Sequence, residues 1–182
     1  MKTRVTYAKK SAIVIVFSAL GVAIAPFFWF WFLGTKAYPT QHMINAILGV
    51  LIGPFWAAIA AIFIGTIRNM LGIGTFYAFP GGIPGGIVVG IVCWFLKRLK
   101  LSEKARSISA FAEPIGTLLI GVPLSLFLLA PDLAAEEGAF FAFLILGSGW
   151  ALSCIPGSVI GFIILLIVDR AGINKEILFG EE

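Results

Sequence analysis

Charged residues are scarce in this chain of 182 residues, at 12% of the total, whereas 60% of the residues are hydrophobic. Soluble domains contain about 25% charged residues, so this composition excludes a soluble globular protein. The net charge of +4 does not indicate nucleic-acid binding, because the basic residues gather in short segments between apolar runs. We therefore expect a protein of the lipid bilayer that has no nucleic-acid partner.

Side chains that hold metals or carry out catalysis are equally scarce. The chain has one histidine and two cysteines, Cys93 and Cys154, and both cysteines lie in apolar runs. The sequence indicates no metal site, no disulfide and no Ser/His/Asp constellation. The glycines of segment 80–86 follow no predicted strand, so we interpret them as a hinge or close-packing turn rather than a phosphate-binding loop. We expect no catalytic residue, no metal and no cofactor, and any ATP would be hydrolysed by partner subunits.

Apolar segments follow one another along the whole chain. A membrane-spanning helix needs about 20 apolar residues. The predicted fold is an all-α membrane protein, a single bundle of six transmembrane helices, with spans at about 11–33, 39–52, 55–71, 83–96, 110–130 and 139–168. Gly53-Pro54 separates the short second and third spans, because proline breaks a helix interior. Pro84 is expected in the first turn of the fourth span, and Pro156-Gly157 is expected to interrupt the sixth.

Basic residues give the orientation of these spans. One group precedes the first span and another lies in segment 97–106, and the positive-inside rule places both groups in the cytoplasm. An even number of spans must separate the two groups, which requires the split at Gly53-Pro54. Both termini are then cytoplasmic, and the loops 34–41, 72–82 and 131–138 lie outside.

Polar side chains gather at the outer ends of the second to fourth spans. Polar groups at membrane depth usually face the interior of a bundle or an aqueous cavity. Aromatic walls with a few converging hydrogen-bonding groups suit a small, flat, polar heterocycle. The predicted substrate-binding residues are Tyr38, His42, Asn45, Arg68, Asn69 and Tyr77, joined by Trp150 and Ser153 of the last span.

Each of these residues also has a structural interpretation. The tyrosines and the histidine can lie at the headgroup interface. Arg68 can complement the end of the third span and extend its charge to water, and Asn69 can cap the same helix end. The two residues of the last span can serve helix packing. Only the convergence of all these residues on one side of the membrane favours a binding site.

Glu113-Pro114 is interpreted as the start of the fifth span near the cytoplasm, since an acid and a proline both favour the first turn of a helix. Glu113 and His42 are the only plausible acid–base groups of an intramembrane enzyme. The predicted topology places them on opposite sides of the membrane. An enzyme is therefore the less favoured alternative.

Small residues recur four apart in the first span, as Ala19 with Ala23 and Gly21 with Ala25. Such faces allow close approach of a second helix. The pattern is compatible both with packing inside the bundle and with docking of a partner protein.

Four segments of the chain resemble the ThiW family, the substrate-binding S components of energy-coupling factor (ECF) vitamin transporters. They are HMINAILGVLIGPFWA, RNMLGIGTFYAFPGGIPGG, AEPIGTLLIG and SCIPGSVIGF. The resemblance covers nearly the whole chain, and the first two segments are the most specific. It implies a six-helix bundle with an outward-facing site, in the plasma membrane of a prokaryote.

The resemblance also implies partners and a cargo. S components dock on a transmembrane coupling protein (EcfT) that carries two ATPase subunits. Ala19 and Ala23 match the Ala-x-x-x-Ala face that contacts the coupling protein in such transporters. Members of the family are assigned hydroxyethylthiazole, the thiazole precursor of thiamine. Hydroxymethylpyrimidine or thiamine would be an alternative substrate of the same class of transporter.

Overall fold

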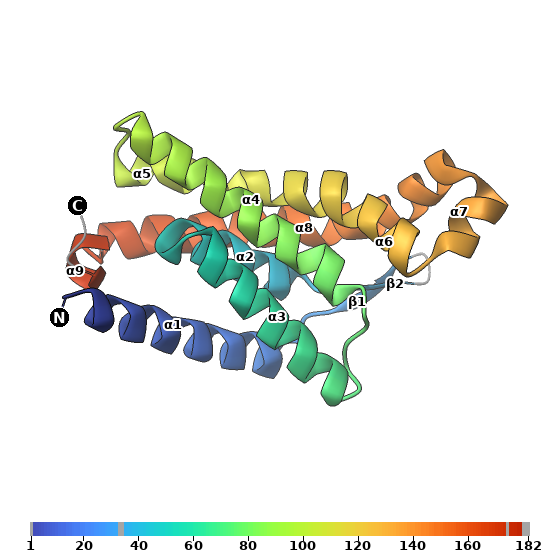
Figure 1. Cartoon of the computed structure of the whole chain (residues 1–182), viewed down its shortest axis with the longest axis horizontal. Coiled ribbons are helices and arrows are strands. Elements are labelled where there is room, and N and C mark those ends of the chain that lie inside the picture. Colours follow the sequence, from blue (N-terminus) through green and yellow to red (C-terminus); the bar gives the residue numbers. More distant parts are fainter. Residues whose placement is uncertain (1, 33–34, 174, 180–182) are drawn as a thin grey trace.

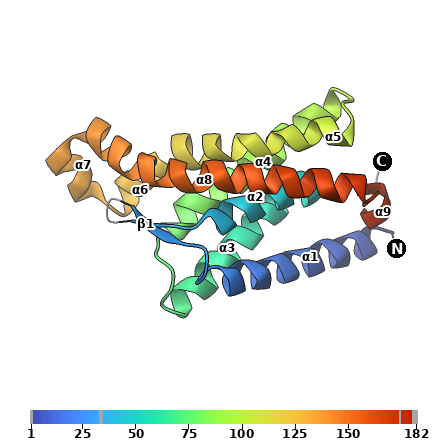
Figure 2. The same cartoon turned by 180° about the vertical axis from the view of Figure 1, so that it is seen from behind.

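The structure, a computed structural model, describes residues 2–32, 35–173 and 175–179 and is almost entirely helical. Its helices run back and forth between the two ends of an elongated bundle (Figures 1 and 2). The elements are α1 Lys2–Ile24, β1 Phe30–Phe32, β2 Thr35–Ala37, α2 Pro39–Ile52, α3 Pro54–Met70, α4 Ala78–Arg98, α5 Glu103–Arg106, the 3-10 helix η1 Ser107–Ala112, the π-helix η2 Ile115–Gly121, α6 Val122–Leu128, α7 Pro131–Glu137, α8 Ala139–Arg170 and α9 Lys175–Phe179.

Four helical segments are long and apolar enough to cross a membrane, among the residues that the structure describes. They are Arg4–Ile24, Ala78–Arg98, Glu103–Leu128 and Ala139–Arg170, and Pro54–Met70 is a shorter apolar helix. This architecture is that of an all-α membrane protein, as the sequence predicts.

Helix α2 forms the centre of the bundle, packed against α8, α4 and α3. Eleven of its 14 residues are buried, polar ones included. It ends at Gly53, whose φ of 90° is favourable only for glycine, and Pro54 then begins α3. The break expected at Gly53-Pro54 is therefore present, and it lets α2 and α3 lie side by side instead of forming one long rod.

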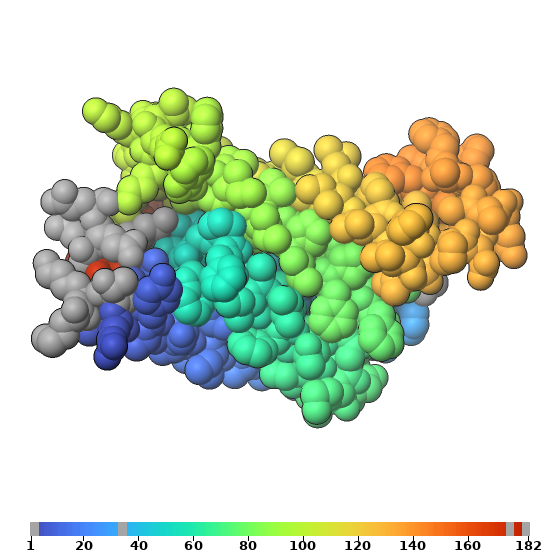
Figure 3. Space-filling model, in the orientation of Figure 1, coloured from blue at the N-terminus to red at the C-terminus, as the bar shows by residue number. Residues whose placement is uncertain are grey.

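The first helix is shorter than the first predicted span. α1 ends at Ile24, because Pro26 disfavours helical geometry at the residue before it. The aromatic block that follows is not helical: Phe30–Phe32 pairs with Thr35–Ala37 as an antiparallel hairpin. The predicted end of this span at Leu33 lies outside the described residues. α1 itself runs along one edge of the molecule (Figure 3).

Helix α4 begins earlier than the fourth predicted span, at Ala78 instead of 83. It runs through the glycine-rich segment, so Pro84 lies inside the helix and not in its first turn. Pro156 likewise lies within the uninterrupted α8. The predictions that Pro84 lies in the first turn of a helix and that Pro156-Gly157 interrupts the last span are therefore both wrong. Neighbouring helices in a membrane bundle can compensate for the backbone groups that a proline leaves unbonded.

The fifth helical segment starts near Glu103, ten residues before the predicted start at Glu113-Pro114. Ser102 caps it by accepting a hydrogen bond from the Ala105 N–H at 3.2 Å. The winding then changes from α5 through η1 and η2 to α6. Glu113 consequently lies in the middle of this segment, at the junction of η1 and η2.

Helix α8 approaches α2 closely at a glycine. A Cβ atom at Gly157 would lie 2.5 Å from the Pro39 carbonyl oxygen and 2.7 Å from the His42 Cβ. At Gly147 of the same helix, the nearest atoms would be 3.8 Å away.

We expect Gly157→Ala to lower the melting temperature in detergent, because overpacking against backbone costs about 1–3 kcal/mol. The matched control Gly147→Ala should leave it unchanged or raise it, since alanine favours a helix by about 1 kcal/mol over glycine. Equal melting temperatures of the two variants would contradict this account of the α2–α8 contact.

Candidate functional site

A pocket lies where α2 begins, next to the end of the β1–β2 hairpin. The empty space between its lining atoms is about 340 Å³, which includes the open solvent at its mouth. The lining residues come from β2, from the residue between β2 and α2, from α2, α3, α4 and α8, and from the loop before α4. They are Ala37, Tyr38, Gln41, His42, Arg68, Tyr77, Gly81, Trp150 and Ser153.

Six of the eight residues predicted from the sequence line this one pocket. They are Tyr38, His42, Arg68, Tyr77, Trp150 and Ser153. Sequence reasoning missed three lining residues. Gln41 precedes His42 in a polar run that could have revealed it, whereas Ala37 and Gly81 carry no polar side chain and give no such signal.

Arg68 is buried beneath the pocket mouth, with 2% of its surface exposed. Its guanidinium carbon lies 3.5 Å from the centre of the Tyr38 ring, a cation–π stack. The Tyr38 hydroxyl donates to the Ile73 carbonyl oxygen, which fixes the ring. Among the described residues no carboxylate lies within 4.0 Å of Arg68. Arg68 therefore does not extend to water, and it presents a charge without an acidic partner beside the pocket.

Two aromatic residues form a second wall. The Tyr77 and Trp150 rings meet edge to face, with centroids 6.4 Å apart and planes at 82°. Trp150 lies against α4 at Gly81, where a Cβ atom would be 3.2 Å from the indole ring. Near this wall, the Ser153 hydroxyl is buried and has no hydrogen-bond partner within the described part of the chain. The site thus combines apolar faces with unused polar groups.

Asn69 does not line the pocket. Its amide nitrogen donates to the Gly65 carbonyl at 2.7 Å and to the Thr75 carbonyl at 3.1 Å, so it ties the end of α3 to the loop beyond. The capping interpretation of Asn69 explains these contacts, whereas a role in direct ligand contact does not explain them.

Asn45 lies on α2 one turn below Gln41, which donates to the Asn45 Oδ1 at 3.4 Å. It is 1% exposed and does not line the pocket. Its amide nitrogen donates to the Gly82 carbonyl at 2.8 Å and to the Glu113 Oε1 at 3.1 Å. Asn45 therefore supports the pocket from beneath.

Glu113 is the residue that sequence reasoning placed wrongly. It is 0% exposed, and its Oε1 lies 2.7 Å from the Nδ1 of His42. The expectation that the two residues lie on opposite sides of the membrane is wrong, because the fifth helical segment starts at Glu103 and carries Glu113 deep into the bundle. Thr117, one turn further along, also contacts Oε1, at 2.9 Å.

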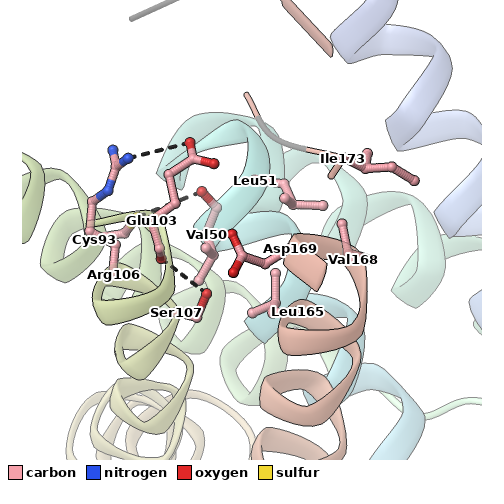
Figure 4. A pocket seen from close by; sticks show the side chains of 10 residues that line it. All are labelled: Val50, Leu51, Cys93, Glu103, Arg106, Ser107, Leu165, Val168, Asp169 and Ile173. Atoms are coloured by element: carbon pink, nitrogen blue, oxygen red, sulfur yellow. Dashed lines mark hydrogen bonds and ion pairs between the residues drawn. The ribbon is translucent and has the colours of Figure 1, made fainter. Parts of the chain in front are cut away.

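A different pocket lies at the opposite end of the bundle, between the end of α2, α4, α5, η1 and the end of α8 (Figure 4). An ion pair of 3.3 Å between Arg106 and Glu103 lies at its edge. No residue of the predicted binding set lines this second pocket. The polar convergence that the sequence predicts belongs only to the pocket at the start of α2.

We expect Asn69→Ala to lower the stability of the protein by roughly 1–2 kcal/mol, because two partly buried hydrogen bonds are lost at the end of α3. Thermal unfolding in detergent measures this loss. Thr66→Ala, an exposed position of the same helix, should change the melting temperature little. An Asn69→Ala variant as stable as wild type would contradict the capping role.

The chain matches the ThiW family, described as thiamine-precursor transporter proteins, over residues 11–171. No curated protein and no solved structure matches it significantly. The family match covers most of the chain and includes every residue of the pocket. The chain therefore belongs to the ThiW family of thiamine-precursor transporter proteins, and it is a component of a membrane transporter rather than an enzyme.

Proposed function

We propose that this protein is the substrate-capture S component of an ECF transporter, and that it takes up hydroxyethylthiazole through the pocket at the start of α2. The observation that carries the proposal is the convergence of Tyr38, His42, Arg68 and Trp150 on one buried pocket, in a chain of a thiamine-precursor transporter family. The chain itself requires no cofactor. ATP would be hydrolysed by two ATPase subunits bound to the coupling protein EcfT.

The proposed topology has six spans in the plasma membrane of a prokaryote, with both termini in the cytoplasm. The spans would be α1, α2, α3, α4, the segment Glu103–Leu128 and α8. The start of α1, the end of α4 and α9 lie at one end of the bundle, opposite the hairpin (Figure 1). The basic segments of the sequence belong to that end, which agrees with the positive-inside rule. The pocket would then open to the outside.

The chemistry of the pocket supports a small heteroaromatic substrate. Trp150 and Tyr77 offer ring faces and edges to a flat molecule, while His42, Gln41 and Arg68 offer hydrogen-bonding groups. Hydroxyethylthiazole combines a small aromatic ring with one hydroxyl. Hydroxymethylpyrimidine and thiamine remain alternative substrates, since they too combine aromatic rings with polar groups.

The outer face of α1 supports docking of the coupling protein. Ala19 and Ala23 are both exposed, whereas Gly21 and Ala25 are buried toward the bundle. A Cβ atom at Gly21 would lie 2.7 Å from Ile44. One small-residue face of α1 thus packs internally, and the other is free for a partner helix. We propose the Ala19–Ala23 face as the contact with EcfT.

Substrate capture is tested by thermal-shift titration of the purified protein with hydroxyethylthiazole, hydroxymethylpyrimidine and thiamine. We expect stabilisation by hydroxyethylthiazole at the lowest concentration. Arg68→Met and Trp150→Leu should weaken that binding at least about tenfold, since each removes a contact of more than about 1.4 kcal/mol. Thr66→Ala, on α3 but outside the pocket, is the control. Absence of stabilisation by any of the three compounds would refute the substrate assignment.

Docking is tested by co-expression with EcfT and the two ATPase subunits. The double variant Ala19→Leu/Ala23→Leu should reduce co-purification of the complex at least about tenfold, because larger side chains prevent close helix approach. Ligand-induced stabilisation of the isolated variant should persist. Val159→Leu, at an exposed position of α8, is the matched control. Unimpaired assembly of the double variant would exclude this face as the docking surface.

A further inference from the structure

Glu113 is the most completely buried acid in the described part of the chain, and it does not itself line the pocket. Three groups from two helical segments meet its Oε1: His42 Nδ1 at 2.7 Å, Asn45 Nδ2 at 3.1 Å and Thr117 Oγ1 at 2.9 Å. The same oxygen occupies the space that a Cβ atom at Gly85 of α4 would fill. Packing and hydrogen bonds thus hold this carboxyl group in one position.

The hydrogen bonds of Asn45 bear on where the proton between Glu113 Oε1 and His42 Nδ1 lies. Its amide nitrogen donates to the carbonyl oxygen of Gly82, an atom that can only accept, so the orientation of the amide is fixed. The second hydrogen of that nitrogen points to Glu113 Oε1. Oε1 therefore accepts from Asn45, and with Glu113 as a carboxylate, which can only accept, the proton between Oε1 and His42 belongs to the histidine Nδ1.

This assignment decides what His42 offers to the pocket. A neutral imidazole carries one N–H, so a proton on Nδ1 leaves Nε2 as an acceptor. The His42 side chain lines the pocket and keeps 9% of its surface exposed. Within the described residues, Nε2 makes no hydrogen bond. It is thus the histidine atom available to a ligand.

The charges around the site favour a neutral His42. Arg68 is a permanent cation of the same pocket, and Glu113 supplies one negative charge. A second cation at His42 would leave a net positive charge at membrane depth, which is costly. The other titratable groups that face the site are Tyr38, Tyr77 and Cys154 of α8. Tyrosine and cysteine are ordinarily uncharged at neutral pH.

We propose that Glu113 is a positioning residue, which holds the proton of His42 on Nδ1 so that Nε2 accepts a hydrogen bond from a hydroxyl or amino group of an uncharged ligand. The inference rests on the proposed function, since it takes the pocket as the capture site. In hydroxyethylthiazole only the hydroxyl can donate, because the thiazole ring has no N–H. The structure thus assigns this hydroxyl to His42.

The first test reads the protonation of His42 directly. The chain contains a single histidine, so ¹⁵N-histidine NMR of protein purified without a polyhistidine tag reports on His42 alone. At pH 8 we expect a protonated Nδ1 and a bare Nε2. Glu113→Gln should keep this tautomer because its Oε1 still accepts, whereas Glu113→Met should shift the population toward the Nε2–H form that free imidazole favours. Ser125→Ala, a buried position of α6 outside the pocket, is the control.

A wild-type Nε2–H tautomer would overturn the inference, and so would a tautomer that Glu113→Met leaves unchanged. Neither result depends on whether any ligand binds. The NMR measurement therefore decides the positioning role even where the substrate assignment fails.

The second test compares hydroxyethylthiazole with the ethyl analogue that lacks the hydroxyl. Wild type should prefer the alcohol at least about tenfold, since the analogue leaves the acceptor unpaired. Glu113→Met should reduce the preference to within about threefold, mainly through weaker binding of the alcohol, and Glu113→Gln should retain it.

A preference for the alcohol that survives in Glu113→Met would overturn the acceptor role of His42 while leaving capture intact. Equal affinity of wild type for the two thiazoles would overturn it as well. If wild type binds neither thiazole, the proposed substrate is wrong, and hydroxymethylpyrimidine with its methyl counterpart replaces the pair in the same comparison.

Discussion

A carboxylate in the apolar interior of a membrane bundle is stable only when donors surround it. At Glu113 only Oε1 has such partners: His42 and Asn45 of α2, and the Thr117 hydroxyl, which also reaches the Gly81 carbonyl. Oε2 is buried without a partner in the described part of the chain. The cluster also reaches α4, because Asn45 donates to the Gly82 carbonyl. A single buried acid thereby ties three helices to one another. The pocket adjoins this cluster, because His42 both lines the pocket and contacts Glu113.

The glycines of α4 are what allow so dense a polar cluster. At Gly85 a side chain would occupy the position of the Glu113 carboxyl group, and at Gly82 it would meet the Gln41 side chain at 3.2 Å. The glycines give this segment of α4 a low intrinsic helix propensity. It is helical nevertheless, and its neighbours approach too closely for any larger residue at these positions. The carbonyls of Gly82 and its neighbour Gly81 lie within hydrogen-bond distance of the Asn45 amide and the Thr117 hydroxyl. Close packing and polar satisfaction therefore depend on each other in this bundle.

Features encoded locally could be predicted from the sequence. Gly53-Pro54 ends the helix between α2 and α3 because of the covalent geometry of proline. Helix α2 accordingly occupies the predicted range 39–52. The polar residues of the pocket could be placed together because helix spacing and the basic segments restrict the possible topologies. Arg68 and Trp150 lie far apart in sequence, and both line the pocket.

Features that depend on distant partners could not be predicted. Glu113-Pro114 satisfies the rules for a helix start, and only the contact with His42, 71 residues away, reveals that it lies mid-segment. In the structure the segment starts instead after Ser102, which caps it. The glycine-rich segment 80–86 likewise resembles a turn, because its local sequence does not reveal its packing partners. Its helix is selected by tertiary packing.

The two proposed activities occupy different helices. No described residue of α1 lines the pocket, and Ala19 and Ala23 face away from the bundle. α1 instead packs along α3, whose outer end carries Arg68. Arg68 has its aromatic contact with Tyr38 and no acidic partner among the described residues, so its environment changes when the position of α3 changes. In the proposed function, docking at α1 can therefore affect the capture site through α3, and also through α2, which α1 contacts at Gly21 and Ile44.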